Sequence, residues 1–327
     1  MVTGFIEGKF LPLHNGHLNA IKHASEMVEK LYVVLGFNDK RDKQLCKDSS
    51  CKEMPFELRL SWLGHELKHL KNIEIHAIED YDDKYDFFKM IPEHKSIFNT
   101  EKLDYVFSSE PSYDPIFKQL YPNAKHILID PKRQQFATSG GSIRKNPFQC
   151  WDDMPSIVRK HFVKKVLITG VESVGKSTMT KLLAEHFNTN YVYEIGRYYC
   201  EKFDNLIIPK HFIEIAMKHF TSIEDLLEHS NKYLFIDTDA IITQYYLLKY
   251  HNISTNKLLD HIVLAQDFDL TFYLEPTVPW VNDGYRFLEN SREDDNKYLK
   301  QFYPNAIFID SPDYKERFKQ VVNHITN

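Results

Sequence analysis

Eight residues in the second half of the chain, 170–177, combine two glycines with a lysine and a hydroxyl. They fit the pattern G-x-x-x-x-G-K-[ST], between an apolar run and a helical pattern. In such a loop the backbone N–H groups and the helix N-terminus face phosphate, the lysine reaches β- and γ-phosphates, and the hydroxyl can ligate Mg²⁺. The loop predicts ATP-dependent phosphoryl transfer, with a chance match in an ordinary loop as the alternative. The residues expected to bind phosphate are Gly170, Ser173, Gly175, Lys176, Ser177 and Thr178.

Two carboxylates, Asp237 and Asp239, follow the apolar run 233–236. An acidic residue at the end of a parallel strand beside a phosphate loop typically lies near Mg²⁺ or the attacking hydroxyl. Either carboxylate could instead cap the next helix. We expect Asp237 to act in catalysis and, with Ser177, in Mg²⁺ binding, and Asp239 to contact substrate.

Charged residues in two further segments are candidates for the same site. Glu194 and Arg197 lie three residues apart and would share a helix face, either toward substrate or as a surface ion pair. Arg286 and Arg292 follow a proline-containing segment, and a loop that carries arginine beside a kinase site could clamp the transferring phosphoryl group. A solvated charged loop is the alternative for these arginines.

The first half of the chain carries a histidine pair around a glycine. His14 and His17 flank Gly16 directly after the first apolar run, at the start of a helical pattern. Imidazoles near a helix N-terminus can donate hydrogen bonds to phosphate oxygens. Nucleotidyl transfer needs an aligned in-line attack on the α-phosphate of ATP and stabilisation of the developing charge, without a covalent protein intermediate. The turn predicts that chemistry, although single histidines are usually structural.

A second turn in the same half could bind phosphate. Ser139 and Arg144 enclose small residues at the start of a short helical pattern, and Asp130 and Arg133 lie just upstream, after the apolar run 126–129. A serine–glycine run is ordinarily a loop. The prediction therefore depends on its pairing with the histidine turn.

The elements that must hold these residues are short apolar runs that alternate with amphipathic stretches. Strands are predicted at residues 4–6, 31–35, 73–78, 105–107, 126–129, 165–168, 233–236, 270–274 and 306–309. Strands that alternate with helices indicate parallel sheets. We therefore expect an α/β protein with two doubly wound parallel-sheet domains, a Rossmann-like nucleotidyl transferase at 1–158 and a P-loop kinase at 159–327.

Composition limits the alternatives. The 327 residues are 43% hydrophobic and 27% charged, as in folded chains, and the net charge of −5 argues against a large basic nucleic-acid surface. With no signal-peptide pattern and no long apolar run, a cytoplasmic protein that is not membrane-embedded is expected. The four cysteines, Cys46, Cys51, Cys150 and Cys200, form no CxxC pair, and we expect free thiols rather than a zinc site.

Together these motifs resemble the NadR-type family of bifunctional NMN adenylyltransferases/ribosylnicotinamide kinases. The resemblance is carried by residues 8–17, 108–111, 139–151, 170–178, 235–239, 241–246 and 279–286. It implies phosphorylation of nicotinamide riboside to NMN by ATP, and adenylylation of NMN by ATP to NAD and pyrophosphate, with Mg²⁺ in both reactions. By position, it implies that ATP phosphates of the transferase are held by Gly8, Lys9, Phe10, His14, Gly16, His17, Ser139 and Arg144. Glu194 and Arg197 would lie near the riboside, and Asp130 and Arg133 near the transferase substrate.

Two departures from the family pattern bear on function. Some members carry an N-terminal helix-turn-helix, whereas Met1 here directly precedes the first predicted strand, so no repressor function and no nucleic-acid partner are expected. The family's second phosphate turn usually has threonine two places after its serine, where this chain has Gly141, and the lost hydroxyl contact could weaken the transferase. A homo-oligomer and a transient contact with a riboside transporter are further expectations.

Two other functions stay open at this point. One is a related transferase fused to a nucleoside kinase with other substrates, such as a pantetheine-phosphate or cytidylyl-type transferase and a deoxynucleoside kinase. The other is a nucleotide sensor without catalysis. The residues that would select the nicotinamide ring are not set by the motifs, and the aromatic candidates for stacking are Trp62, Tyr113 and Trp280.

Overall fold

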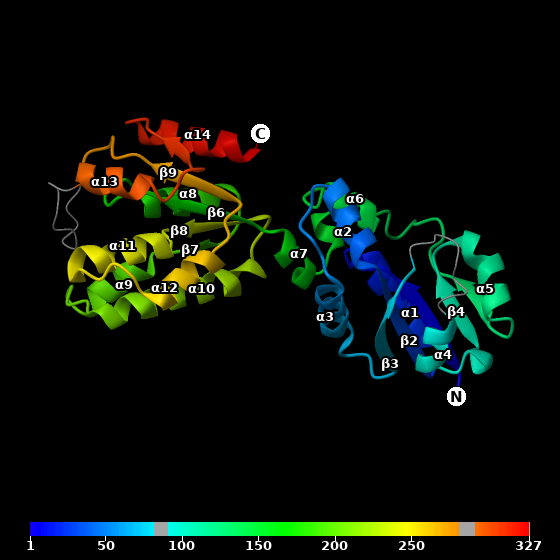
Figure 1. Ribbon diagram of the computed structural model, residues 1–327. Helices are drawn as coiled ribbons and strands as arrows, with labels where there is room; N and C mark the ends of the chain where they lie inside the picture. The colour runs from blue at the N-terminus through cyan, green and yellow to red at the C-terminus, as the bar shows by residue number, and fades with distance from the viewer. Residues whose placement is uncertain (82–90, 281–291, 327) are drawn as a thin grey trace. The chain divides into compact units, whose positions relative to one another are not determined.

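The chain folds into two compact units, Met1–Phe162 and Val163–Asn327, each built on its own parallel sheet (Figure 1). The computed structural model describes residues 1–81, 91–280 and 292–326. The expected pair of doubly wound α/β domains is confirmed. The assignment of one activity to 1–158 and another to 159–327 stays a prediction.

The N-terminal unit has five parallel strands in the order β3-β2-β1-β4-β5. They are β1 Thr3–Gly8, β2 Lys30–Phe37, β3 Ile73–Glu79, β4 Tyr105–Ser108 and β5 Lys125–Leu128. The helices are α1 Asn15–Met27, α2 Asp39–Asp48, α3 Phe56–Leu67, α4 Ile91–Ile97, α5 Asp114–Leu120, α6 Gly140–Lys145 and α7 Ser156–Phe162. Short 3₁₀ turns occupy Thr100–Lys102, Pro111–Tyr113 and Trp151–Asp153.

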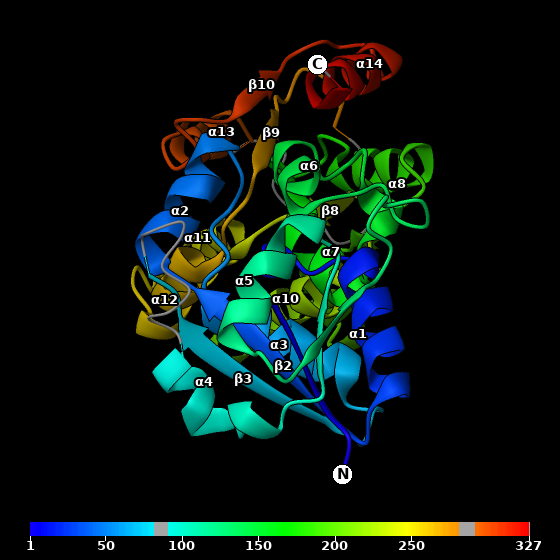
Figure 2. The ribbon, with the colours of Figure 1, turned by 90° about the vertical axis from the view of Figure 1, so that its right-hand side faces the viewer.

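Helices cover both faces of this sheet (Figure 1 and Figure 2). Strand β2 is therefore buried at six consecutive positions, 31–36, instead of alternating between buried and exposed side chains. On the face of α4 and α5, Phe5 packs with Tyr32, Val34 and Val106 in one apolar cluster. This packing fixes the carboxyl ends of β1 and β2, where the histidine turn and α2 begin.

The C-terminal unit has five parallel strands in the order β10-β9-β6-β8-β7. They are β6 Lys164–Thr169, β7 Tyr191–Val192, β8 Tyr233–Asp237, β9 Leu270–Leu274 and β10 Ile307–Ile309. The helices are α8 Lys176–His186, α9 Ile195–Lys202, α10 Pro209–Leu227, α11 Ala240–His251, α12 Lys257–Ala265, α13 Arg292–Lys300 and α14 Tyr314–Thr326. Strand β7 was not expected, because two residues at a sheet edge leave no apolar run in the sequence.

Two helical layers enclose the second sheet. Helix α14 contacts α8, and α10 packs against α9, α11 and α12 on the opposite side (Figure 1). Because β6 and β8 are neighbours, the loop after β6 and the residues after β8 meet at one edge of the sheet. Within the described part of the chain, no helix combines the length and the apolar character needed to cross a membrane.

Candidate active sites

The loop 170–175 joins β6 to α8 in a conformation that its glycines permit. Gly170 and Gly175 have φ of 135° and 88°, in the region that disfavours side chains. A Cβ on Gly170 would lie 2.6 Å from the Leu274 carbonyl oxygen, and one on Gly175 would lie 2.4 Å from the Tyr314 ring. The backbone can therefore turn its N–H groups toward a phosphate.

Lys176 begins α8 and is 7% exposed. Its ammonium donates to the Val171 carbonyl oxygen at 2.9 Å, so the side chain curls over the loop. Ser177 and Thr178 follow on the exposed side of the first turn. The Ser177 hydroxyl is hydrogen-bonded to the carboxyl of Asp237, which joins the loop to the end of β8.

Asp237 is buried beside this loop with part of its hydrogen-bonding capacity unused. Its Oδ1 accepts from the Thr238 hydroxyl at 3.1 Å, whereas its buried Oδ2 has no hydrogen-bond partner among the described residues. Burial, and next Glu194, raise the pKa of Asp237 to about 6, while Lys176 and Ser177 act in the opposite direction. An unpaired buried carboxylate oxygen needs a ligand to offset its desolvation.

The donors at this point fit Mg²⁺, which binds oxygen and keeps several water molecules. The Ser177 hydroxyl and the free Oδ2 of Asp237 are two such oxygens. No group of three or more His, Cys, Asp or Glu side chains that could hold a metal occurs in the described residues. The remaining ligands would therefore be phosphate and water oxygens.

Asp239 caps helix α11. Its Oδ1 accepts from the Ile242 N–H at 3.1 Å and from the Tyr303 hydroxyl at 2.8 Å. Burial raises its pKa to about 6. The capping alternative is thus realised, and the carboxyl also borders the cavity described next. Its expected role at the substrate stays a prediction.

A cavity of about 400 Å³ opens beside the phosphate loop. This volume suits a nucleoside-sized ligand. The polar side chains that line it include Glu172, Lys176, Glu194, Arg197, Thr238 and Asp239. Glu194 precedes α9 and Arg197 lies in its first turn, so the structure brings both to the cavity, although Arg197 also pairs with Glu201 at 3.2 Å.

Several residues of the cavity were missed from the sequence. Glu172 stands at a variable position of the loop pattern and is hydrogen-bonded to Tyr246, whose pKa burial raises well above its ordinary value. His219 bonds the Asp237 carbonyl oxygen at 3.1 Å and is kept neutral, because burial lowers its pKa to about 4. Thr238 has a φ of 74°, a strained value for a β-branched residue. The sequence signal for this side of the cavity is the repeated tyrosines of α11, of which Tyr246 and Tyr250 line it.

Two arginines hold the phosphate loop by its backbone. Arg292, at the start of α13, donates to the carbonyl oxygens of Val278 at 2.9 Å and Ser173 at 3.2 Å. Arg317, fully buried in α14, donates to Val174 O at 3.2 Å. Both therefore support the loop. Arg286 lies outside the described residues.

The histidine turn of the N-terminal unit forms a stacked pair. The rings of His14 and His17 lie 3.7 Å apart between centroids, at the start of α1. Burial, and next Arg133, lower the pKa of His14 to about 4; burial, and next His14, lower that of His17 well below its ordinary value. Both rings are neutral at pH 7, and both Nδ1 atoms are buried without a partner in the described residues. Each ring therefore keeps hydrogen-bonding capacity for a ligand.

The surroundings of this turn are tightly packed. Phe10 is 2% exposed and meets the His17 ring edge-on, so its expected contact with phosphate could come only from its backbone. A Cβ on Gly8 would lie 3.1 Å from the Phe10 ring, and one on Gly16 3.1 Å from the His14 ring. The two glycines thus let the turn close around the histidines.

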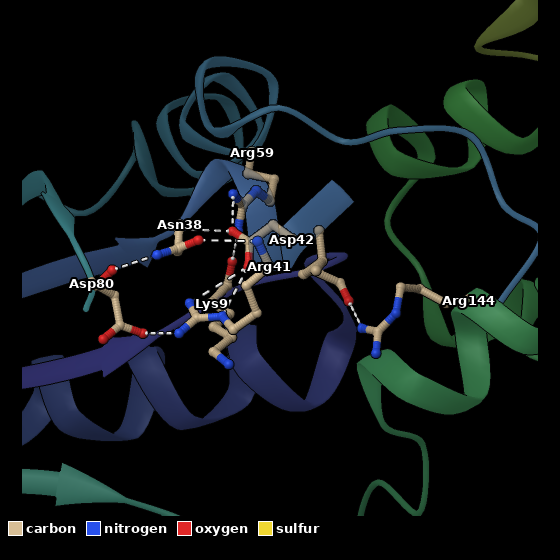
Figure 3. Close-up of polar contacts among 8 residues, drawn as sticks. Lys9, Asn38, Arg41, Asp42, Arg59, Asp80 and Arg144 are labelled. Carbon is tan, nitrogen blue, oxygen red and sulfur yellow. Dashed lines mark hydrogen bonds and ion pairs between the residues drawn. The ribbon is translucent and has the colours of Figure 1, made fainter. Parts of the chain in front are cut away.

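Lys9 lies in a cluster of charged side chains at the ends of β1 and β2 (Figure 3). Arg59 is fully buried and donates to Lys9 O and to the Asp42 carboxylate, both at 2.7 Å. Arg41 donates to the Asp80 carboxylate at 2.6 Å. Burial, and next Arg41, lower the pKa of Lys9, which shows that the two cations are close.

This cluster has an excess of positive charge. Its cationic side chains outnumber its two carboxylates, Asp42 and Asp80, by two. The cationic members are Lys9, Arg41, Arg59 and Arg144. Such a site attracts phosphate in a chain that is acidic as a whole. Arg41 was missed from the sequence, because a single arginine in a charged helix carries no signal.

The second phosphate turn lies against the histidine turn. Ser139 caps α6 and accepts from the Ser142 N–H at 3.1 Å. Arg144 donates to the Leu11 carbonyl oxygen at 2.5 Å, and a Cβ on Gly140 would lie 2.6 Å from the same oxygen. The structure therefore brings Ser139 and Arg144 to the loop that carries His14.

The two upstream candidates differ in their surroundings. The carboxylate of Asp130 accepts hydrogen bonds from the backbone N–H groups of Gln134, Gln135 and Phe136 at 2.8–3.3 Å, so it folds its own turn, and its expected contact with substrate stays a prediction. Arg133 pairs with Glu110 at 2.7 Å and acts electrostatically on both histidines.

The aromatic candidates for stacking also differ. Trp62 is 1% exposed and packs on His161, which excludes it from stacking on a ligand in this structure. Tyr113 is 37% exposed, and Trp280 is partly exposed.

Known proteins are similar in sequence to nearly the whole chain and to parts of it. Residues 165–317 match the AAA domain family. The trifunctional NAD biosynthesis/regulator protein NadR of Escherichia coli is 34% identical over 98% of the chain, which covers 81% of that protein, and that of Salmonella typhimurium is 33% identical over the same shares. Phosphopantetheine adenylyltransferase of Streptococcus pneumoniae is 28% identical over 43% of the chain and 81% of its own length.

The solved structures agree in fold. A NadR protein crystallised with NR superposes with a TM-score of 0.79 at 21% identity, over 99% of this chain and 94% of that one. A NadR complex with NAD and AMP-PNP superposes equally well at 20% identity, over 99% and 95%. Because the Escherichia coli protein is 34% identical over 98% of this chain, and the chain covers 81% of that protein, the chain belongs to the NadR family.

Proposed function

We propose that the chain is a bifunctional enzyme of NAD salvage. The C-terminal domain would phosphorylate nicotinamide riboside to NMN, and the N-terminal domain would join NMN to the AMP part of ATP. The observation that supports this best concerns buried polar atoms that have no hydrogen-bond partner among the residues that the structure describes. Each unit holds such atoms beside a turn expected to bind phosphate: Asp237 Oδ2 in one unit, and both histidine Nδ1 atoms in the other. The printed function and ligands of the NadR relatives agree with these substrates.

In the kinase, the 5′-hydroxyl of the riboside attacks the γ-phosphorus of ATP while the bond to ADP breaks. The loop N–H groups and Lys176 bind the β- and γ-phosphates, and Lys176 would exchange its bond to Val171 O for phosphate oxygens. Ser177 and Asp237 would hold Mg²⁺, which neutralises phosphate charge when it is bound. We infer that the ionised Asp237 carboxylate would also accept the proton of the hydroxyl.

The charge of the cavity favours a cationic nucleoside. Its wall has three carboxylates, Glu172, Glu194 and Asp239, against the two cations Lys176 and Arg197. Lys176 would be occupied by phosphate, which leaves the riboside pocket acidic. The pyridinium ring of nicotinamide riboside carries a positive charge that suits carboxylates and the nearby faces of Tyr246 and Tyr250. A neutral deoxynucleoside would leave these carboxylates uncompensated.

In the transferase, a phosphate oxygen of NMN attacks the α-phosphorus of ATP, and pyrophosphate leaves. The neutral rings of His14 and His17 would donate hydrogen bonds to oxygens on which charge develops, in a buried site where such bonds are strong. Lys9, Arg41 and Arg144 would bind the phosphates of the two substrates. Assembly into a homo-oligomer and contact with a riboside transporter stay predictions.

The test is a comparison of substrates with the purified chain and Mg²⁺-ATP. Nicotinamide riboside should be phosphorylated with a far higher kcat/KM than neutral ribosides and deoxynucleosides, and NMN should be adenylylated in preference to phosphopantetheine. A preference for deoxynucleosides or phosphopantetheine would favour the related enzyme with other substrates. Tight ATP binding without turnover of any of these would favour a sensor.

A further inference from the structure

Cys46 and Cys51 form a close thiol pair at the end of α2. The Cys51 N–H donates to the Cys46 carbonyl oxygen at 3.0 Å, and the Ser50 N–H donates to Lys47 O at 3.0 Å, with Ser50 left-handed at a φ of 53°. This helix ending brings together the side chains of the third residue from the end of the helix and the third residue beyond it. Here both are cysteines, and their thiols are hydrogen-bonded.

The two thiols differ in access and in acidity. Cys46 is 1% exposed, whereas Cys51 is partly exposed. The hydrogen bond from Cys51 lowers the pKa of Cys46 to about 7 and raises that of Cys51, so the pair shares one proton near neutral pH. A thiolate is the nucleophile of disulfide exchange, and the pair supplies one.

The pair lies next to the phosphate-binding cluster of the N-terminal unit. Asp42, one turn before Cys46 on α2, accepts from Arg59, which also donates to Lys9 O. Arg144 acts electrostatically on both thiols. A change at the thiols therefore reaches two residues of the proposed transferase site, Lys9 and Arg144.

We propose that Cys46 and Cys51 form a reversible intramolecular disulfide and that this bond slows adenylyl transfer by the N-terminal unit. A low-molecular-weight disulfide, RSSR, is the oxidant. The Cys51 thiol passes its proton to the Cys46 thiolate as the Cys51 sulfur attacks RSSR and expels RS⁻. This RS⁻ takes the proton from Cys46, whose thiolate then attacks the Cys51 sulfur and expels the second RS⁻, which takes up a proton from water. Two protein thiols are oxidised, and one RSSR is reduced to two RSH.

The bond changes the site in two ways. The sulfur atoms must move from contact to a bond of about 2.05 Å, which pulls the end of α2 toward the segment that leads into α3 and Arg59. The negative charge that the thiolate offers to Arg144 and Arg59 is also removed. The effect on activity rests on the proposed adenylyl transfer, whereas formation of the bond does not.

The experiment oxidises the full-length chain with glutathione disulfide and alkylates the remaining thiols before peptide mass spectrometry. Cys150 and Cys200 are internal controls and should stay alkylated, while residues 46 and 51 should appear as one cross-linked species that dithiothreitol reverses. Oxidation should slow NAD formation from NMN several-fold and leave riboside phosphorylation unchanged. Cys51→Ser, at the partly exposed position, should keep its full transferase rate in the oxidant.

Four alkylated cysteines after oxidation, or a stable glutathione adduct at Cys51 without closure, would overturn the disulfide. Equal inhibition of the wild type and Cys51→Ser would overturn its effect on activity. If the reduced wild type makes no NAD from NMN, the proposed transferase function fails, and the mass measurement still decides whether the bond forms.

Discussion

At the residue scale, the buried carboxylate of Asp237 is proposed to act in catalysis, and its ionisation lowers the free energy of unfolding. Its folded-state pKa of about 6 lies above the ordinary value of 3.8, because burial disfavours the charged form. Asp237→Asn should abolish riboside phosphorylation, since it removes the carboxylate charge, and should raise the free energy of unfolding at pH 7 by on the order of 2 kcal/mol. Kinase assays and urea denaturation measure the two effects.

The sign of this effect can be checked by pH. The folded carboxyl binds its proton more tightly than the unfolded one, so its contribution to stability is present below about pH 4 and is lost as pH rises through about 6. The stability gain of Asp237→Asn should therefore be largest at pH 7 and vanish near pH 4. Wild-type kinase activity should fall as pH drops through about 6. A gain that is constant from pH 4 to 7 would contradict the assigned pKa.

A substitution at Gly141 tests whether the missing threonine hydroxyl weakens the transferase. A Cβ there would meet only the Ser139 hydroxyl at 3.7 Å and the Arg144 guanidinium at 3.9 Å, so a side chain fits. Gly141→Thr supplies the family's hydroxyl and should lower the KM for ATP in the transferase without changing the kinase. Steady-state kinetics of both reactions measure this.

The matched control is Gly140→Ala, in the same helix turn. Its Cβ would lie 2.6 Å from the Leu11 carbonyl oxygen, so it should displace α6 from the histidine turn and slow the transferase. If both substitutions slow NAD formation equally, then position 141 does not tolerate a side chain, and the prediction that a threonine hydroxyl there helps to bind ATP is wrong.

At the scale of elements, the phosphate loop depends on α14 as well as on β6 and α8. Arg317 donates to the carbonyl oxygens of Ser311, Val174 and Glu275 at 2.5, 3.2 and 2.7 Å. Arg317→Met keeps much of the packing but removes all three hydrogen bonds. The Ser311 oxygen still accepts from the Thr277 hydroxyl, whereas the Val174 and Glu275 oxygens lose the arginine donor, at about 1–3 kcal/mol for each group left unsatisfied.

The variant should therefore lower the stability of the C-terminal unit and raise the KM for ATP in the kinase. Calorimetry and kinase kinetics measure these effects, and Lys319→Met on the exposed side of the same helix is the control. Unchanged kinase kinetics in a destabilised Arg317→Met would show that α14 does not act on the loop.

The elements also show how far sequence reasoning reached. Every strand of the described residues except β7, and the two turns expected to bind phosphate, could be predicted, because apolar runs and local spacing indicate them. The edge strand β7 could not, because two residues have no period. The support of the loop by Arg317 and of Lys9 by Arg59 could not either, because it joins residues 143 and 50 positions apart. The hydrogen bonds of the Asp130 carboxylate to the backbone N–H groups of Gln134, Gln135 and Phe136 were not predicted either, although they are local.

At the scale of the whole molecule, the chain has two compact units, each with its own sheet and its own phosphate-binding turn. The net charge of −5 does not describe the two sites. Positive charge is in excess around Lys9, whereas the cavity beside Lys176 has more carboxylates than cations. The two proposed reactions use oppositely charged substrates, an anionic nucleotide and a cationic riboside. The net charge of the chain therefore predicts the local charge of neither site.

The central claim is that one chain holds two independent sites. Its most direct test incubates the wild type, Lys176→Ala and His17→Ala with Mg²⁺-ATP and either nicotinamide riboside or NMN, with the products resolved by chromatography. The wild type should make NAD from both substrates. Lys176→Ala should make NAD from NMN alone, and His17→Ala should convert the riboside to NMN and stop there. Loss of both activities in either folded variant, or NAD formation from NMN by His17→Ala at the wild-type rate, would contradict the account.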